Sequence, residues 1–287
     1  MPTIEKVLFP VDFSVSCNAM APFVQRAAAI LAAKVTLLYV LEPSTSGFEF
    51  LARTAPDIDE DRKESARAAL DVYLTSAFPL HQVPRLVVAG EAGAQIARIA
   101  REGEFQLIVM PTHAGVFRRM LLGSTAAKVL NDSDSLVWTT HHAETIAPRP
   151  LEHREMACAL GLGAGSERVL RCAIALAEKL RENLSIIHAI PATEQGLPTQ
   201  LELDENVRLP AIQAARDRLD EMQSVLGSRA RVHIVVGPIK DAVAEAAGRL
   251  QSDMLVVGRS AQAAELGRLR DLTYALVRDA PCPVLSV

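Results

Sequence analysis

Leu107–Leu130 holds the residues whose types and spacing are best suited to chemistry. An apolar run at Leu107–Met110 is typical of a buried parallel strand, and a loop that contains Gly115 and Gly123 follows it. Ser124 then stands at an expected helix N-cap. A strand, a loop and a helix start in this order gather free backbone N–H groups and the positive end of a helix dipole, which suits an anion such as phosphate. Spacing alone favours a plain crossover connection, which every α/β protein contains, over an anion site.

The elements that must position this stretch alternate between strand and helix. The predicted strands of the first half are Val7–Val11, Val35–Leu41, Arg85–Val88, Leu107–Met110 and Ser135–Thr139. Segments with helical periodicity separate them. Short links between alternating elements favour an α/β fold with a parallel sheet covered on both faces, and right-handed crossovers leave few topologies.

The same pattern starts again after His141–Arg154, which has no periodicity and is predicted to be a linker. The predicted strands of the second half are Met156–Leu162, Leu184–Ile190, Val232–Val236, Met254–Val257 and Pro283–Val287. Gly90 and Gly237 follow the third strand of each half. We therefore predict two copies of one domain, at residues 1–142 and 153–287.

Bulk composition excludes several classes of protein. The chain has 287 residues, a formal net charge of -4 and few aromatic residues, and it lacks the clustered Lys and Arg of a nucleic-acid-binding surface. The four cysteines are far apart without a CxxC pair, which favours a reducing compartment over a disulfide framework or a zinc site. No apolar run reaches the roughly 18 residues of a membrane span, and no signal-peptide pattern is present. We expect a soluble, cytoplasmic protein.

A glycine-rich turn at Gly161–Glu167 partly matches the dinucleotide fingerprint GxGxxG. The sixth position is Ser166, and no acidic residue stands at the end of the next predicted strand, where the fingerprint requires one. A tight turn is therefore the favoured interpretation, although another anion could still bind at the N-terminus of the following helix.

Taken together and in order, several segments resemble the universal stress protein family. They are KVLFPVDFS, VTLLYVL, GEAGAQIARIA, LIVMPTHAG and RRMLLGSTAAKVL in the first half, with DMLVVGRS and DAPCPVLSV in the second. The resemblance covers nearly the whole chain. It implies that each half is a doubly wound domain with a five-stranded parallel sheet in the order 3-2-1-4-5 and two helices on each face. It also implies pairing through fifth strands, either as an intrachain pseudo-dimer or in a homodimer.

The resemblance implies a site for an adenine nucleotide such as ATP in the crevice beyond strands 1 and 4, where the strand order reverses. Asp12 matches the family's acidic residue that contacts the adenosine part, and Val40 matches a position that lines the adenine pocket. The family's phosphate loop reads glycine, two residues, glycine, nine residues, glycine, then Ser or Thr. Gly123 and Ser124 match its end, with Thr125 beside them.

The start of this loop departs from the family pattern. The candidate loop residues are Pro111, Thr112, His113, Ala114, Gly115, Gly123, Ser124 and Thr125. Pro111 stands at the first glycine and removes a backbone donor, Ala114 stands at the second and resists a positive φ, and the loop is one residue short. Gly115 could restore flexibility after a one-residue shift. His113 and the pair Arg118–Arg119 could supply compensating positive contacts.

The second half has lost more of the implied site. Gly161 stands where the first half has Asp12, and Arg270–Leu272 replaces the glycine and the two hydroxyl residues. A carboxylate at Asp271 would repel phosphate, and loss of the acidic contact alone would cost about 1.5–3 kcal/mol. We therefore predict a degenerate site with a structural role.

The sequence favours a regulatory module that binds ATP or another adenine nucleotide in its first half. No Ser–His–Asp or Cys–His arrangement accompanies the loop, so a dedicated enzyme is not expected. Cys17 lies near a helix N-terminus, where a lowered thiol pKa would suit a redox role, and the alternative is a small buried side chain. Two other functions remain open: a stress-response interaction or dimerisation protein that binds no nucleotide, and slow ATP hydrolysis.

Overall fold

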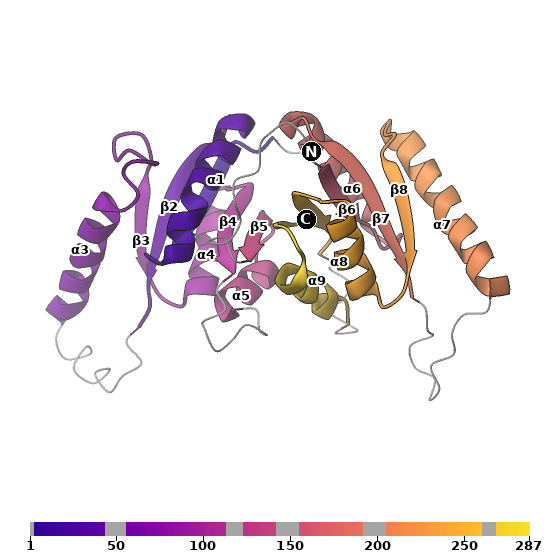
Figure 1. The fold of residues 1–287 in the computed structure, drawn as a ribbon. Coiled ribbons are helices and arrows are strands. Elements are labelled where there is room, and N and C mark those ends of the chain that lie inside the picture. The colour runs from indigo at the N-terminus through magenta and orange to yellow at the C-terminus, as the bar shows by residue number, and fades with distance from the viewer. Residues whose placement is uncertain (1–2, 44–55, 113–122, 142–154, 192–204, 260–267) are drawn as a thin grey trace. The chain divides into compact units, whose positions relative to one another are not determined.

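The computed structural model describes residues 3–43, 56–112, 123–141, 155–191, 205–259 and 268–287. The chain divides into two compact units, residues 2–147 and 148–287, and each is described by itself (Figure 1). Among the described residues no helix is long and apolar enough to cross a membrane.

The first half is built on one parallel sheet in the order β3-β2-β1-β4-β5. Its strands are β1 (Lys6–Val11), β2 (Lys34–Leu41), β3 (Arg85–Ala89), β4 (Leu107–Thr112) and β5 (Leu136–His141). Val11 pairs with Tyr39 across β1 and β2, and Val7 pairs with Leu107 across β1 and β4. All residues of β4 are buried, as expected for a central strand covered on both faces. The predicted order 3-2-1-4-5 is confirmed.

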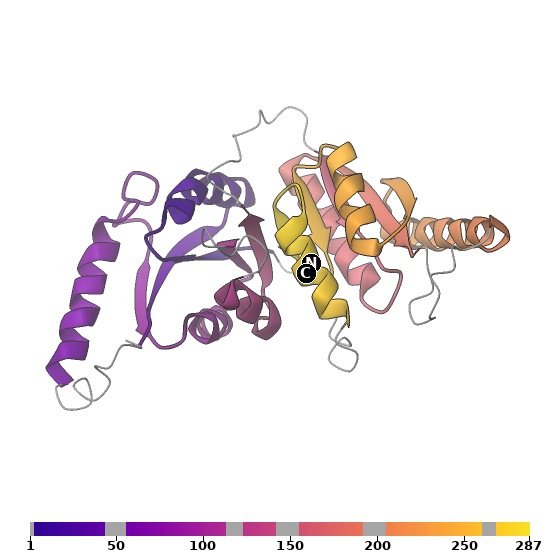
Figure 2. The same cartoon turned by 60° about the horizontal axis from the view of Figure 1, so that its bottom comes forward.

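Within the described part of the first half, four helices cover the two faces of this sheet. They are α1 (Val15–Leu31), α3 (Pro56–Val72), α4 (Ala92–Glu102) and α5 (Ser124–Asp132). Right-handed crossovers place α1 and α3 on one face and α4 and α5 on the other, and Figure 2 shows α1 across the sheet from α4 and α5. The core between the sheet and its helices includes Phe9. Its ring packs edge to face against that of Phe78, with 6.0 Å between the ring centroids.

The second half repeats this arrangement, with the sheet order β10-β9-β6-β7-β8. Its strands are β6 (Glu155–Ala159), β7 (Asn183–Ile190), β8 (Arg231–Val236), β9 (Met254–Val257) and β10 (Val284–Ser286). Its helices are α6 (Ser166–Leu180), α7 (Glu205–Leu226), α8 (Ile239–Arg249) and α9 (Arg268–Asp279).

The two halves also share the backbone conformation of the turn that follows their third strands. Gly90 and Gly237 have φ values of 141° and 154°, which favour glycine at both positions. Each donates its N–H to the last residue of the second strand of its half, Leu41 or Ile190, at 3.0 Å. Two copies of one fold therefore share both their sheet order and the closure of this turn.

The structure corrects two expectations around β4. This strand continues through Pro111 to Thr112, because its β1 side is paired only at Leu107 and Ile108, and an unpaired strand end tolerates proline. The N-cap of α5 is Gly123, so Ser124 is the first helical residue instead of the cap.

Candidate functional site

A cavity of about 780 Å³ lies at the carboxyl ends of the strands of the first half, where the strand order reverses between β1 and β4. Ligands of doubly wound folds bind at this position, and the volume lies in the usual range for small-molecule sites. The predicted site residues that line it are Asp12, Val40, Pro111, Gly123, Ser124 and Thr125. The topology thus brings four separate segments of the sequence to one place.

The other predicted site residues are placed differently. Thr112 is not among the residues that line the cavity; it is buried, and its hydroxyl donates to the carbonyl of Thr140 at 3.4 Å. His113, Ala114 and Gly115 lie outside the described residues, as does Arg118–Arg119.

The turn between β1 and α1 holds Asp12 in a fixed orientation. The Asp12 carboxylate oxygen Oδ1 accepts hydrogen bonds from the Ser14 N–H at 3.0 Å and from the Cys17 thiol at 3.1 Å. The Ser14 hydroxyl in turn accepts from the Cys17 N–H at 3.2 Å and caps α1. Phe13 has a positive φ of 61°, and Leu162 at the equivalent turn of the second half has 57°. This left-handed residue lets the chain reverse direction between strand and helix.

Aromatic packing holds the strained Phe13 in place. Its ring centroid lies 4.7 Å from that of Tyr39 and 4.9 Å from that of Tyr73. Tyr39 also lines the cavity. Burial, together with the nearby Cys17 and Asp12, raises the pKa of Tyr73, so this phenol stays protonated at physiological pH.

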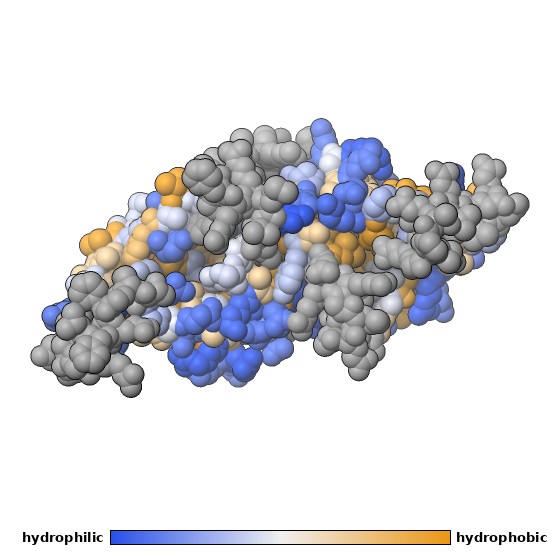
Figure 3. Space-filling view, turned by 90° about the horizontal axis from the view of Figure 1, so that it is seen from below, coloured by the Kyte–Doolittle hydropathy of each residue, from blue (hydrophilic) through white to orange (hydrophobic). Residues whose placement is uncertain are grey.

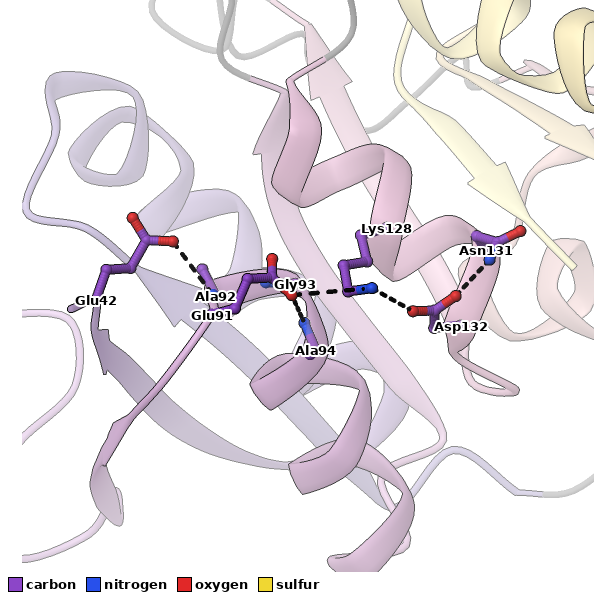
Figure 4. Close-up of polar contacts among 8 residues, drawn as sticks. All are labelled: Glu42, Glu91, Ala92, Gly93, Ala94, Lys128, Asn131 and Asp132. Carbon is purple, nitrogen blue, oxygen red and sulfur yellow. Dashed lines mark hydrogen bonds and ion pairs between the residues drawn. The ribbon is translucent and has the colours of Figure 1, made fainter. Parts of the chain in front are cut away.

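The starts of α1, α4 and α5 all reach the cavity, and among the described residues side chains bind N–H groups at the starts of α1 and α4. Glu91 caps α4 by accepting from the N–H groups of Gly93 at 2.9 Å and Ala94 at 3.0 Å. The Glu42 carboxylate accepts from the Ala92 N–H at 3.2 Å, so two carboxylates lie at this helix start (Figure 4). Negative charge at an N-terminus stabilises the helix and would repel phosphate there.

At the N-terminus of α5 no such side chain is found among the residues that the structure describes. Its N-cap Gly123 forms no side-chain capping bond, and Gly123, Ser124 and Thr125 line the cavity. An open helix start facing a cavity offers N–H donors and a positive dipole end to an anion. Phosphate binding is therefore favoured at α5 over α4.

Lys128 ties these two helices together. Its ammonium lies 3.1 Å from Asp132 of the same helix and 3.9 Å from Glu91 at the start of α4 (Figure 4). The hydrogen bond to Asp132 and the two negative charges raise the pKa of Lys128. The ion pair therefore keeps its charge at neutral pH and links the middle of α5 to the start of α4.

Sequence reasoning missed several residues that line the cavity, among them Tyr39, Glu42, Arg62 and Ile96. The Arg62 guanidinium donates to the main-chain carbonyl of Glu42 at 3.1 Å, which places a cation beside the end of β2. Arg62 belongs to α3, whose exposed face carries many charges, so the sequence contained no signal that singled it out.

The structure confirms that Cys17 is a small buried side chain and not a thiol activated at the start of α1. Burial raises the pKa of Cys17 to about 12, and the adjacent Asp12 carboxylate adds to this effect. These influences outweigh the helix N-terminus, which would lower the value. Cys17 is therefore a small protonated side chain that donates to Asp12.

Native Cys17 is expected to react with iodoacetamide near pH 8 on the order of a thousandfold more slowly than an unperturbed cysteine, because the thiolate is the reactive form. Timed alkylation followed by peptide mass spectrometry measures this rate, with urea-unfolded protein as the control. Labelling at equal rates before and after unfolding would contradict a buried, protonated thiol.

The fold and the position of the cavity are those of doubly wound α/β domains that bind ligands at the topological switch point. The model of the universal stress protein family matches residues 3–141 and again residues 153–287. The chain therefore belongs to the universal stress protein family, with two family domains in tandem. The comparison with curated proteins found no match.

Solved structures with the same fold cover the whole chain. A universal stress protein from Archaeoglobus fulgidus DSM 4304 is 18% identical, covers 100% of this chain and 98% of its own, and has a TM-score of 0.69. A functionally unknown protein from Pseudomonas aeruginosa PAO1 is 16% identical, with coverages of 99% and 92% and a TM-score of 0.65. At these identities the likeness concerns the fold alone.

A further similar structure is the universal stress protein from Archaeoglobus fulgidus in complex with dAMP. It is 14% identical, covers 48% of this chain and 98% of its own, and has a TM-score of 0.35. Its ligand is not transferred to this chain.

Proposed function

We propose that the first half binds an adenine nucleotide, with ATP as the expected ligand. The observation that carries the proposal is that a single cavity is lined both by the Asp12 carboxylate and by the open N-terminus of α5. An acceptor for a ribose hydroxyl and a group of donors for phosphates thus line the same cavity. Membership of the universal stress protein family supports this assignment.

The nucleoside end is assigned to the side of the cavity formed by β1 and β2. Asp12 lies there, and a carboxylate has enough lone pairs to accept from a ligand as well as from Ser14 and Cys17. Val40 and Ile96 supply apolar contacts for a base. A planar ring that enters this space would also meet the Tyr39 side chain, which Phe13 supports.

The phosphate end is assigned to the start of α5. The backbone N–H groups of this helix and the hydroxyls of Ser124 and Thr125 are the donors available to phosphate oxygens. Pro111 offers no N–H on the opposite side, so we expect these donors to carry most of the phosphate contact.

The role proposed for the bound nucleotide is regulatory: the domain would change its partners or its stability with nucleotide occupancy. Slow ATP hydrolysis is the other candidate outcome. Phosphate release assays on the purified chain distinguish the two, because a regulatory module should leave ATP intact over hours.

Replacing Ser124 by alanine is expected to weaken ATP binding about two- to tenfold, because a single hydrogen bond typically contributes 0.5–1.5 kcal/mol. Adenosine should bind the variant and the wild type equally, since the hydroxyl lies at the phosphate end. Isothermal titration calorimetry with both ligands measures the difference. An equal loss for ATP and adenosine would place Ser124 away from the phosphates.

A further inference from the structure

The second half has a cavity of its own, with different chemistry. It has a volume of about 820 Å³ and opens at the carboxyl edge of the second sheet. The described residues that line it include no aspartate, glutamate, phenylalanine, tyrosine or tryptophan, while Arg168 and Arg259 contribute positive charge. Branched aliphatic side chains form much of the wall, among them Leu160, Val169, Ile190, Val243, Val257 and Leu276. Figure 3 looks onto this edge and shows hydrophobic residues at the surface of the C-terminal half.

The turn between β6 and α6 lacks the acceptors that fill the same turn in the first half. There, Asp12 and Ser14 accept hydrogen bonds from the backbone N–H groups at the start of α1. Gly161 and Gly163 stand at their positions, and Gly165, the N-cap of α6, forms no side-chain capping bond. A Cβ atom built at any of these three glycines would meet nothing within 4 Å. The start of α6 therefore has open space beside it.

Ser166 is a second, independent sign of a ligand at this place. It is only 7% exposed and lines the cavity, and its hydroxyl has no hydrogen-bond partner among the described residues. The hydroxyl lies in the wall of the cavity and is not taken up by a side-chain or backbone acceptor of the described residues, so a ligand can reach it. A ligand oxygen at the start of α6 would satisfy it.

We propose that this cavity binds an amphipathic carboxylate, such as a medium-chain fatty acid. The carboxylate lies at the N-terminus of α6 within reach of the Ser166 hydroxyl, and the alkyl chain lies along the aliphatic wall. The helix start and the two arginines favour an anion. Among the described lining residues the one aromatic ring is the imidazole of His188, whose Nδ1 lies 2.8 Å from the Leu160 carbonyl oxygen, and Gly161 offers no carboxylate to a ribose. This site is separate from the nucleotide site proposed for the first half.

Isothermal titration calorimetry of the full chain with hexanoate, octanoate and decanoate tests the proposal. Each added methylene is expected to lower the dissociation constant by a factor of about two, and by up to about fourfold if the alkyl chain is fully buried. Octanol, which has the chain without the charge, should bind at least tenfold more weakly than octanoate. Equal binding of octanol and octanoate, or no binding of either, would overturn the proposal.

The variants Gly163→Asp and Gly163→Asn locate the head group. The two side chains are nearly equal in size, and only aspartate brings negative charge to the start of α6. We expect octanoate binding to be lost in Gly163→Asp and largely kept in Gly163→Asn, while Ser166→Ala weakens it severalfold. Equal affinities of the Asp and Asn variants would overturn the assignment, and circular dichroism checks that both fold.

Asp12→Ala is the control variant in the first half. It should weaken ATP binding and leave octanoate binding unchanged. Gly163→Asp should abolish octanoate binding and leave ATP binding unchanged. Loss of octanoate binding in Asp12→Ala would show that the fatty acid occupies the first cavity, which would overturn the proposal without deciding whether ATP binds there.

Discussion

Replacing Asp12 by alanine is expected to weaken ATP binding about ten- to a hundredfold. A hydrogen bond to a charged group contributes about 1.5–3 kcal/mol, which corresponds to this loss of affinity. The affinity for adenosine should fall by a similar factor, because the carboxylate is assigned to the nucleoside end of the cavity. Calorimetric titration of both ligands gives the two dissociation constants, and an unchanged constant for ATP would contradict the proposed role of Asp12.

Asp12→Asn is the matched variant, since it keeps the size of the side chain and an acceptor oxygen while it removes the charge. It should bind ATP with an affinity between those of the wild type and Asp12→Ala. Because Asp12 also accepts from Ser14 and Cys17, the stability of each variant must be measured separately. An Asn variant as weak as the Ala variant would show that the charge, and not the acceptor, is what matters.

Replacing Phe9 by alanine is expected to lower the free energy of unfolding of the first half by about 3–5 kcal/mol. The side chain is 0% exposed and packs edge to face against Phe78, so truncation leaves a cavity in the core. Trp138, the single tryptophan of the chain, is buried in β5 against Phe23 and reports on this half. Urea unfolding followed by its fluorescence measures the change.

Val72→Ala serves as the control for this measurement. Val72 ends α3 and is 74% exposed, so its truncation should change the free energy of unfolding by no more than about 0.5 kcal/mol. If Phe9→Ala lowered the free energy of unfolding by less than about 1.5 kcal/mol, the core would have repacked around the missing ring, which would contradict the close packing described for this sheet.

Much of the fold could be predicted from the sequence, because local signals and global topology agree. The apolar runs at Val7–Val11 and Leu107–Met110 are buried on both faces in the structure, as central parallel strands must be. Right-handed crossovers then left few alternatives for the strand order. Pairing of the two halves through their fifth strands, or of two chains, stays a prediction.

The candidate site could be predicted in part. Asp12, Val40 and Gly123 line the first cavity, because the ends of parallel strands and the starts of the following helices meet at one edge of a sheet. The capping of α4 by Glu91 and the approach of Arg62 to Glu42 depend on side-chain contacts between distant elements. Helical periodicity contains no information about such contacts.

The cavity of the second half was also beyond sequence reasoning. Loss of the acidic residue and the hydroxyls predicts a changed site, but the volume of a cavity depends on how side chains pack. Small residues at Gly161 and Gly163 leave space where the first half has Asp12 and Ser14. Ser166 became notable only through its place in the wall of this cavity.

The stoichiometry of ATP binding to the full chain, measured by isothermal titration calorimetry, tests the difference between the two halves. We predict one molecule of ATP per chain, because the first half combines Asp12 with an open α5 N-terminus and the second half has no acidic equivalent. No heat of binding at any ATP concentration would contradict nucleotide binding, and two molecules per chain would contradict the proposed loss of the second site.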